Sequence, residues 1–448
     1  MSYLTAISVY HYIMVTIQLV ERAFASWIWY NIIYDEMEVK RMEKNLTFIH
    51  AADLHLDSPF KGLANIPEHI FSDVLKSTFT ALDRLIEVAI ERKVDFIILA
   101  GDLFDNERKS LKVQIHLRNA FEKLNHYDIY VYLSYGNHDY INGNIHQIEY
   151  PENVYCFPDE KVRYVTYERN GKSMAAIYGF SFENQAVKIN KSLEYEIVDD
   201  TIPFHIAMLH GSLSSNAEHN RYAPFQLGDL IKKRFDYWAL GHIHRRDILS
   251  TNPPVVYPGN TQGRHRKETG EKGCYHVTLT ETDSELSFIP LQSILFNTFT
   301  VDVSHCSNIT QLEMTLKTHM DKQLTNFPQL VHLTLLNERE EDFQGENKFV
   351  FEEMIDIIND TYVNQKNWLY IYRHTVMNKE RKIEQSLIEG DHFIGELTTQ
   401  LTRSPIESYL NHLYQHRQAR KYLEPLSTED IEKIREEAYD LLVNKLLN

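Results

Sequence analysis

Five short clusters hold the residue types in this sequence that are best suited to chemistry. Each cluster lies at or just after the end of a predicted strand, where open α/β sheets place their ligands. The clusters are Asp53-Leu54-His55, Gly101-Asp102-Leu103-Phe104-Asp105, Gly136-Asn137-His138-Asp139, His210-Gly211 and Gly241-His242-Ile243-His244. Together they offer carboxylates, one amide and several imidazoles to a common site.

This mixture of donors predicts a hydrolytic metal centre. Oxygen ligands combined with imidazoles suit manganese, iron or zinc, and no cysteine lies among them. In Asp53-x-His55 and His242-x-His244 the one-residue gap places both side chains on the same side of an extended segment. Asp102 has two carboxylate oxygens and could bridge two ions. A pair of ions activates water and neutralises charge during displacement at phosphorus, so the chemistry predicted is phosphoester hydrolysis.

Each cluster taken singly has an ordinary explanation. A D-x-H tripeptide is common by chance, and glycines also serve as turn residues at strand ends. An isolated histidine such as His205 is more often packed or hydrogen-bonded than bound to metal. The ordered series D-x-H, G-D-x-x-D, G-N-H-D, H-G and G-H-x-H within one domain is not expected by chance. The series as a whole therefore supports a metal site.

The elements that must position these clusters alternate between strands and helices, which is typical of an α/β fold. Strands are predicted at residues 46–52, 94–100 and 129–134. Helices are predicted between them, at 71–92 and 111–124, because apolar residues recur there at helical spacing. Shorter strands follow and indicate a second sheet packed on the first. They cover residues 162–167, 174–180, 205–209, 237–240, 255–257, 275–279 and 285–290.

Two further regions follow the predicted catalytic domain, which spans residues 42–295. Residues 296–378 continue the strand and helix patterns and are predicted to form a small α/β cap domain. Residues 379–448 are predicted to form a helical partner-binding region. Ser404-Pro405-Ile406-Glu407 contains the N-cap serine, first-turn proline and capping-box glutamate of a helix start, and a second amphipathic helix follows Ser427. These helices would either dock on their own domain or bind a partner helix.

Residues 1–41 differ in character from the rest, because residues 2–20 include no charged side chain. A secretory signal usually begins with a positive region, and no Lys or Arg precedes Arg22. Polar residues also make this stretch a weak candidate for a membrane span. We therefore expect a dispensable N-terminal extension, with translation beginning at Met42 or Met37, and no stable membrane association.

Composition and charge limit the classes of function. The 448-residue chain has 43% hydrophobic and 24% charged residues, which is typical of folded proteins with more than one domain. The widely spaced Cys156, Cys274 and Cys306 predict neither a disulfide framework nor a cysteine zinc site, so a cytoplasmic location fits best. A net charge of -17 excludes binding of nucleic acid by bulk electrostatics. A role on DNA would need local basic patches, bound metal or a partner.

The ordered series of clusters resembles the calcineurin-like metallophosphoesterase superfamily over residues 46–292. The resemblance implies a sandwich of two packed mixed sheets flanked by helices. It also implies two divalent metal ions. The residues implied as ligands of the first ion are Asp53, His55, Asp102 and His244. Those implied for the second ion are Asp102, Asn137, His210 and His242.

The same resemblance implies that His138 is catalytic and does not bind metal. In that superfamily the matching histidine stabilises the transition state or protonates the leaving oxygen. Asp139 would then hold the imidazole of His138 in orientation. An ordinary alternative for Asp139 is that it caps a turn.

Two segments narrow the resemblance within the superfamily. Residues 48–57 (FIHAADLHLD) and 257–264 (YPGNTQGR) are similar to the SbcD-type DNA-repair exonucleases, especially their bacterial YhaO-like branch. The resemblance implies an exonuclease or endonuclease that prefers Mn²⁺ and forms a homodimer through its catalytic domain. It further implies a cap domain that helps to select DNA and C-terminal helices that bind the coiled coil of an SbcC-like ATPase.

Two other functions remain open from the residues themselves. A nucleotide or phosphoprotein phosphatase would use the same metal centre, because the fold does not choose the substrate. A noncatalytic subunit that bridges an ATPase and DNA is the third alternative, although the complete ligand set speaks against it. Basic residues near the predicted site could guide a phosphate backbone, while Glu268 and Glu271 weaken that patch. The basic residues are Arg245, Arg246, Arg264, Arg266, Lys267 and Lys272.

Overall fold

The computed structural model describes most of the chain between residues 45 and 378. The described residues are 45–60, 63, 66–105, 110–143, 148–214, 222–337 and 346–378, together with Ile431, Ile434 and Ala438. The expectations for residues 1–41 lie outside this part of the chain, as do nearly all of those for 379–448. Ile431, Ile434 and Ala438 are helical, as predicted for the last amphipathic helix, and Ile431 is buried. Among the described residues, no helix is long and apolar enough to cross a membrane.

The first six-stranded sheet contains the strands that precede three of the five clusters. Its order is β12-β11-β1-β2-β3-β4. Strands β1 to β4 run parallel, and β11 pairs antiparallel with both β1 and β12. The strands are β1 (Leu46–Ala51), β2 (Phe96–Ala100), β3 (Tyr130–Ser134), β4 (Val154–Cys156), β11 (Gly273–Leu279) and β12 (Ser284–Pro290). Parallel β1, β2 and β3 therefore end at the same edge of the sheet.

The second six-stranded sheet has the order β5-β6-β7-β8-β10-β9. Its inner strands run parallel, and the edge strands β5 and β9 are antiparallel to their neighbours. The strands are β5 (Arg163–Arg169), β6 (Lys172–Gly179), β7 (Phe204–His210), β8 (Tyr237–Gly241), β9 (Asp247–Thr251) and β10 (Pro254–Tyr257). The last two clusters begin at the ends of β7 and β8.

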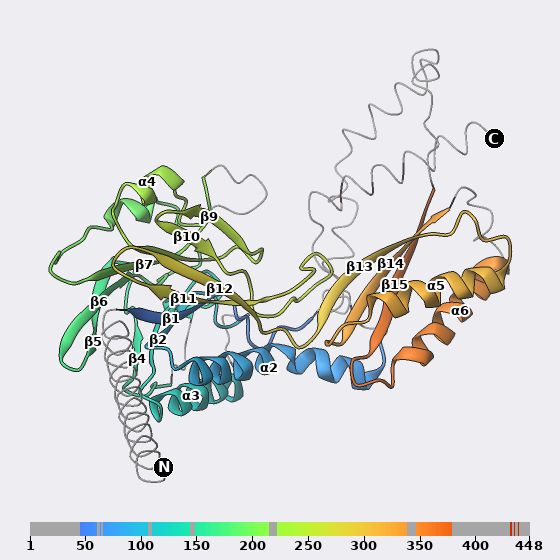
Figure 1. The fold of residues 1–448 in the computed structure, drawn as a ribbon, viewed down its shortest axis with the longest axis horizontal. Helices are drawn as coiled ribbons and strands as arrows, with labels where there is room; N and C mark the ends of the chain where they lie inside the picture. Colours follow the sequence, from blue (N-terminus) through green and yellow to red (C-terminus); the bar gives the residue numbers. More distant parts are fainter. Residues whose placement is uncertain are drawn as a thin grey trace, which may run out of the picture.

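The two sheets pack face to face through a buried aromatic and aliphatic layer. Phe48 on β1 stacks on Phe96 on β2 with ring centroids 5.2 Å apart, and Tyr237 from the second sheet meets Phe48 edge-on at 5.2 Å. Burial of each such ring contributes roughly 1.5–3 kcal/mol. On its other face, the first sheet is covered by α2 (Glu68–Arg92) and α3 (Leu111–Asn125), which pack on the same core cluster (Figure 1). The predicted sandwich of two mixed sheets flanked by helices is confirmed.

Short elements account for most differences from the predicted pattern. Strands β4 and β9 and the five-residue helix α4 (Leu227–Ile231) are not predicted. β9 is largely exposed, so it lacks the apolar alternation that marks a half-buried strand. On α3, Ile115 is one of the apolar residues that indicate the helix, but its side chain is exposed, and Val113 is buried in the core.

A separate parallel sheet follows, in the order β13-β14-β15. Its elements are β13 (Leu295–Asp302), α5 (Ile309–Gln323), β14 (Gln329–Asn337), α6 (Glu346–Tyr362) and β15 (Leu369–Asn378). Both helices pack on the sheet through one apolar cluster that includes Leu316, Leu333 and Ile358. We call the described residues before Leu295 the two-sheet unit and those of 295–378 the three-stranded unit.

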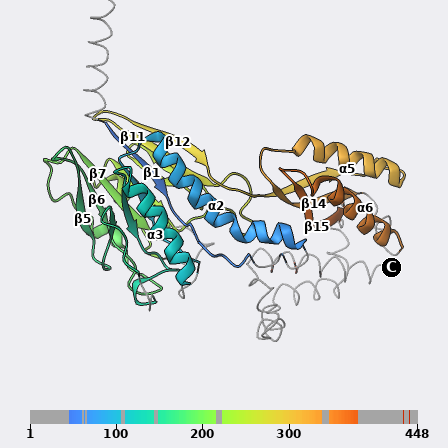
Figure 2. The same cartoon turned by 90° about the horizontal axis from the view of Figure 1, so that it is seen from below.

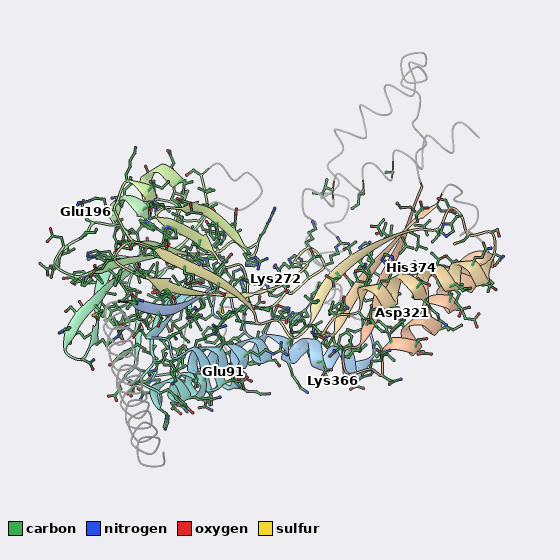
Figure 3. All side chains as sticks on the ribbon, in the orientation of Figure 1. Glu91, Glu196, Lys272, Asp321, Lys366 and His374 are labelled. Atoms are coloured by element: carbon green, nitrogen blue, oxygen red, sulfur yellow. The ribbon has the colours of Figure 1, made fainter. Side chains whose placement is uncertain are left out.

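Helix α2 links the two units physically. Its first turns bury Ile70 and Val74 against Leu330 and Trp368 of the three-stranded unit, and its later turns pack on the first sheet. Figure 2 shows α2 extending from beneath the first sheet toward β14 and β15. In Figure 3, Glu91 near the end of α2 and His374 on β15 mark the two units that this helix joins.

Candidate metal centre

The five clusters meet where parallel strands of both sheets end. β1, β2 and β3 of the first sheet, and β7 and β8 of the second, each deliver one cluster to this edge. Three groups of three side chains there have ligand atoms that all lie within 4.8 Å of one another. Two of them consist of predicted ligands: Asp53, His55 and His244, and Asp102, His210 and His242. The third contains His55, Asp105 and His138. The structure thus brings together the residues that the sequence predicts for two metal ions.

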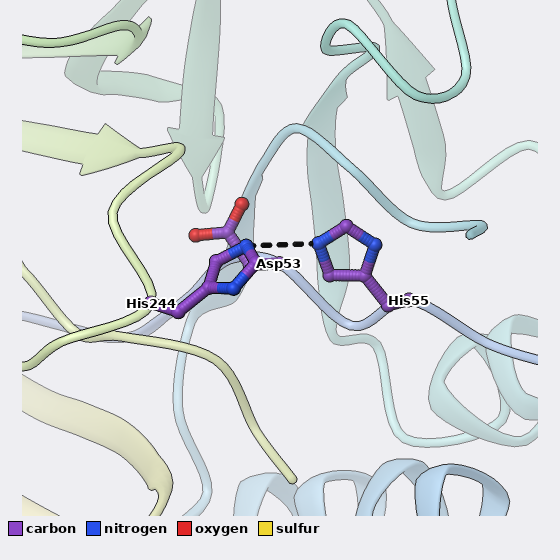
Figure 4. Close-up of side chains that lie close together, drawn as sticks. All are labelled: Asp53, His55 and His244. Carbon is purple, nitrogen blue, oxygen red and sulfur yellow. Dashed lines mark hydrogen bonds between the residues drawn. The ribbon is translucent and has the colours of Figure 1, made fainter. Parts of the chain in front are cut away.

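The first group consists of Asp53, His55 and His244 (Figure 4). The Nε2 atoms of the two imidazoles lie 3.1 Å apart, and the Asp53 carboxylate lies beside them. Both oxygens of Asp53 accept a hydrogen bond from the backbone N–H of His242 at 3.0 Å. Burial and the charge of Arg264 lower the pKa of His55 to about 3, so its imidazole is the neutral form that can donate a lone pair.

The second group adds Asn137 to Asp102, His210 and His242. Oδ1 of Asn137 lies 3.0 Å from His210 Nε2 and 3.1 Å from His242 Nδ1. Nδ1 of His210 is held by the Ala100 carbonyl oxygen at 3.0 Å. Burial opposes a charge on His210, but the adjacent Asp102 carboxylate raises the pKa of His210 to about 9. The nitrogen of His210 that faces the site is therefore in a strongly negative environment that also suits a cation.

Asp102 lies between the two groups. Its Oδ2 is 3.8 Å from Nε2 of His55 and 3.4 Å from Nε2 of His210, and its Oδ1 accepts the backbone N–H of His138 at 2.9 Å. One carboxylate in reach of both groups is the arrangement expected of a bridging ligand. The donor set, with carboxylate, amide and imidazole groups, fits two divalent transition-metal ions.

The backbone of these residues adopts a conformation that most residues avoid. Asp53, His55, Asp102 and His242 have φ values of 52°, 42°, 50° and 94°. Aspartate and histidine tolerate this left-handed region better than most residues, yet it still raises the energy of the folded chain. Backbone bonds from Asp53 to Gly101 and from His55 to Asp102 stabilise it. Such strain is concentrated at functional sites.

Glycines allow the strand ends to approach one another. A Cβ on Gly136 would lie 2.4 Å from Oδ1 of Asp102, and one on Gly241 would lie 1.9 Å from the carbonyl oxygen of Ala100. Neither position has room for a side chain. The glycines of the motifs therefore serve the packing of the site as well as the turns.

The contacts of His138 and Asp139 show what holds each of these two side chains in place. Nδ1 of His138 lies 3.0 Å from the carbonyl oxygen of Asp105, and the His138 ring meets the His55 ring edge-on at 4.9 Å. The carboxylate of Asp139 accepts 2.7 Å bonds from the backbone N–H groups of Leu103 and Gly136. The Asp105 carbonyl thus holds the His138 ring, and Asp139 fixes the two loops; that Asp139 also orients the His138 imidazole stays a prediction.

Three residues at the site are missing from the predicted set. Glu268 is buried and lies 2.6 Å from Nδ1 of His244. Asp105 lies 3.4 Å from Nδ1 of His55, and the guanidinium of Arg264 bonds to Asp105. Burial would raise the pKa of Asp105, but its bond to His55 and the charge of Arg264 hold the pKa at about 2. The second aspartate of the G-D-x-x-D motif is a usable signal for Asp105, and Arg264 ends the segment 257–264 and is one of the predicted basic residues near the site. Glu268 has no such signal.

Several side chains of the predicted basic patch make contacts within the fold. The Lys272 ammonium is nearly buried and donates to the carbonyl oxygen of His244 at 3.0 Å. Arg246 stacks its guanidinium over the Phe288 ring at 3.8 Å, and Arg264 belongs to the site. Arg245 and Lys267 are exposed. Fewer basic side chains are therefore available to a phosphate backbone than the sequence indicates.

The fold and the site define a class of enzyme, the metallophosphoesterases. Residues 46–246 match the calcineurin-like phosphoesterase family. The chain is also 39% identical over 411 residues to the uncharacterized metallophosphoesterase YhaO of Bacillus subtilis, and the match covers 90% of this chain and 99% of that protein. The chain therefore belongs to the calcineurin-like phosphoesterase family and is a metal-binding phosphoester hydrolase, as predicted.

More distant relatives match a smaller part of the chain. A DNA double-strand break repair protein Mre11 from Methanocaldococcus jannaschii is 26% identical over 256 residues, which cover 54% of this chain and 65% of that protein. The Mre11 protein of Thermoplasma acidophilum is 26% identical over 233 residues, which cover 48% of this chain and 60% of that protein.

Proposed function

We propose that this protein is a manganese-dependent DNA exonuclease or endonuclease that hydrolyses phosphodiester bonds in DNA repair by a two-metal mechanism. The observation that carries the proposal is the position of Asp102, which belongs to the second group of metal-binding side chains and also reaches His55 of the first. The similarity to the Mre11 proteins, whose names specify double-strand break repair, supports DNA as the substrate.

The side chains divide the work between binding and proton transfer. When bound, two divalent ions would supply the positive charge that attracts the phosphate and lowers the pKa of water. Asp53, His55, Asp102 and His244 would hold the first ion. Asp102, Asn137, His210 and His242 would hold the second. The neutral His55 imidazole and the negative environment of His210 suit these roles.

His138 is placed to move a proton to the leaving oxygen. A carbonyl oxygen can only accept, so the 3.0 Å contact with Asp105 assigns the Nδ1 proton to His138. Nε2 is then the nitrogen that gives or takes a proton during the reaction. The side chain is partly exposed beside the first metal group, where a substrate can reach it.

The wider proposal includes partners and location. An SbcC-like coiled-coil ATPase would bind residues 379–448 in the cytoplasm, and the three-stranded unit would help to select DNA. A homodimer would form through the two-sheet unit.

The decisive experiment compares substrates with the full-length chain in MnCl₂. Linear duplex DNA, single-stranded DNA and p-nitrophenyl phosphoesters would be incubated with the wild type and with His138→Ala. We expect shortening of DNA that depends on manganese and is lost in the variant. Hydrolysis of the small esters with intact DNA would instead identify a phosphatase. Binding of DNA without any hydrolysis would identify a bridging subunit.

A further inference from the structure

Two carboxylates lie behind the imidazoles of the first metal group. Glu268 Oε1 is 2.6 Å from Nδ1 of His244, and Asp105 Oδ1 is 3.4 Å from Nδ1 of His55. The Nε2 atoms of these imidazoles face one another at 3.1 Å. A carboxylate at the rear nitrogen fixes the tautomer and the ring orientation and makes the front nitrogen a stronger donor to metal.

Arg264 connects the two carboxylates. One guanidinium nitrogen bonds to Asp105. The other lies 3.2 Å from Nδ1 of His244 and 3.7 Å from Oε1 of Glu268, with which it forms an ion pair. The backbone N–H of Arg264 also donates to Glu268 Oε2 at 2.7 Å, as does the Asn260 amide. Only 14% of the Arg264 side chain and 7% of the Glu268 side chain are exposed. The planar guanidinium can satisfy both acids at once in a way that a lysine ammonium cannot.

The position of Glu268 suits a supporting role for His244. Its carboxylate is buried and places Oε1 directly at the rear nitrogen of the imidazole. The carboxylate of Glu268 bonds to one predicted ligand, His244, and to the loop that surrounds Glu268. Because the two residues are 24 positions apart in the chain, no local turn or helix explains their contact.

The second metal group is supported differently. The bond behind its His210 comes from the neutral carbonyl oxygen of Ala100 at 3.0 Å. The nearest carboxylate oxygen to that Nδ1 belongs to Asp53, which is farther away at 3.9 Å. A neutral acceptor polarises an imidazole less than a carboxylate does, so the two sites are not equivalent.

We propose that Glu268, Asp105 and Arg264 form a positioning network that sets the cation affinity of the first metal site independently of the second. The network holds His55 and His244 with their Nε2 atoms converging on one point and strengthens both as donors. It rests on the proposed two-metal function and adds to it a division between a tightly held ion and a more weakly held one.

Calorimetric titration of the metal-free, full-length protein with MnCl₂ tests this proposal. The wild type should bind two ions, with higher affinity at the first site. Glu268→Gln keeps the shape of the side chain and removes its charge, so one site should lose about 10- to 100-fold in affinity while the other is unchanged. Raising the MnCl₂ concentration should restore the activity of the variant. Glu271→Gln, an exposed glutamate three residues away, is the matched control and should bind as the wild type does.

Unchanged binding at both sites, or equal weakening of both, would overturn the proposal. Thermal unfolding of each metal-free variant shows whether it is folded, and Arg264→Lys gives an independent answer if Glu268→Gln is not. Loss at one site is again expected, because lysine cannot hold both acids, and binding like that of the wild type again overturns the proposal. A wild type that binds two ions but leaves DNA intact refutes only the proposed nuclease function.

Discussion

Asp102 shows how much of the site depends on single side chains. Its carboxylate is buried, lies within 3.8 Å of imidazoles from both groups, and accepts the backbone N–H of His138. His138 itself has its rear nitrogen occupied by a backbone carbonyl. In the proposed mechanism Asp102 serves metal binding and His138 serves proton transfer, so mutation should separate the two functions.

Replacement of Asp102 by alanine should remove metal and activity together. Without the bridging carboxylate, both groups lose a shared ligand, so manganese measured on the purified protein should fall from two ions to less than one per chain. Equilibrium dialysis against MnCl₂ would measure this. Asp73→Ala, on the exposed face of α2, is the control and should retain both ions. Normal metal content in Asp102→Ala would contradict the bridging role.

His138→Ala should retain metal but lose turnover. Loss of a proton donor typically lowers kcat by about 100- to 10,000-fold, while the ligands of both ions stay in place. Turnover and bound manganese would be measured on the same sample, with the exposed His69→Ala as control. If the variant lost metal to the same extent as Asp102→Ala, the separate role of His138 would be refuted.

The ligand types at these positions could be predicted from sequence because the motifs are short and follow strands. The two residues of a pair follow the same strand, so a single strand end brings them together, as for Asp53 with His55 and for His242 with His244. Glu268 could not be predicted, since its partner His244 is 24 residues away and nothing local distinguishes it from a surface acid. The orientation of His138 depends on a backbone carbonyl, which no side-chain pattern reveals.

At the scale of elements, the site exists because parallel strands from two sheets end together. The ends of β2, β3, β7 and β8 approach so closely at this edge that Gly101, Gly136 and Gly241 have no room for a Cβ. Long buried strands such as β2 and β7 could be predicted, because continuous apolar runs mark them. The exposed edge strand β9 could not, since tertiary pairing rather than local pattern defines it.

Gly241→Ala should damage the site through packing alone. Its Cβ would collide with the Ala100 carbonyl oxygen and lie 2.9 Å from Nδ1 of His210, the two atoms that hydrogen-bond to one another. We expect a loss of about 1–3 kcal/mol in the free energy of unfolding, together with weaker manganese binding. Chemical denaturation measures the first quantity. Gly228→Ala, where a Cβ meets open space, should be neutral or slightly stabilising.

At the scale of the whole molecule, α2 is a shared component of both units. Its apolar stripe is continuous, with Leu82 and Leu85 on the first sheet and Ile70 and Val74 against the three-stranded unit. At 1.5 Å per residue its 25 residues span about 37 Å. The sequence predicts the helix but not that it packs on both units, because an apolar stripe has the same pattern whichever unit it packs against.

Trp368→Ala should loosen the connection between the units. This side chain is nearly buried against α2, and its truncation should lower the free energy of unfolding by about 3–5 kcal/mol. None of the predicted metal ligands belongs to this apolar cluster, so manganese content should stay normal. Calorimetry and limited proteolysis would detect earlier release of the three-stranded unit. Trp368→Phe, which keeps most of the ring, should show a smaller effect, and equal effects would argue against a packing role.

The left-handed backbone at Asp53, His55, Asp102 and His242 has a consequence for selection and engineering. Glycine adopts such a conformation without the steric penalty of a Cβ, so metal-free Asp102→Gly should be more stable than metal-free Asp102→Ala by about 1 kcal/mol. Thermal unfolding of the pair would show the difference. A library of variants screened for heat resistance in the presence of a chelator would therefore be enriched in glycine at the ligand positions. The enriched variants would have lost catalytic activity.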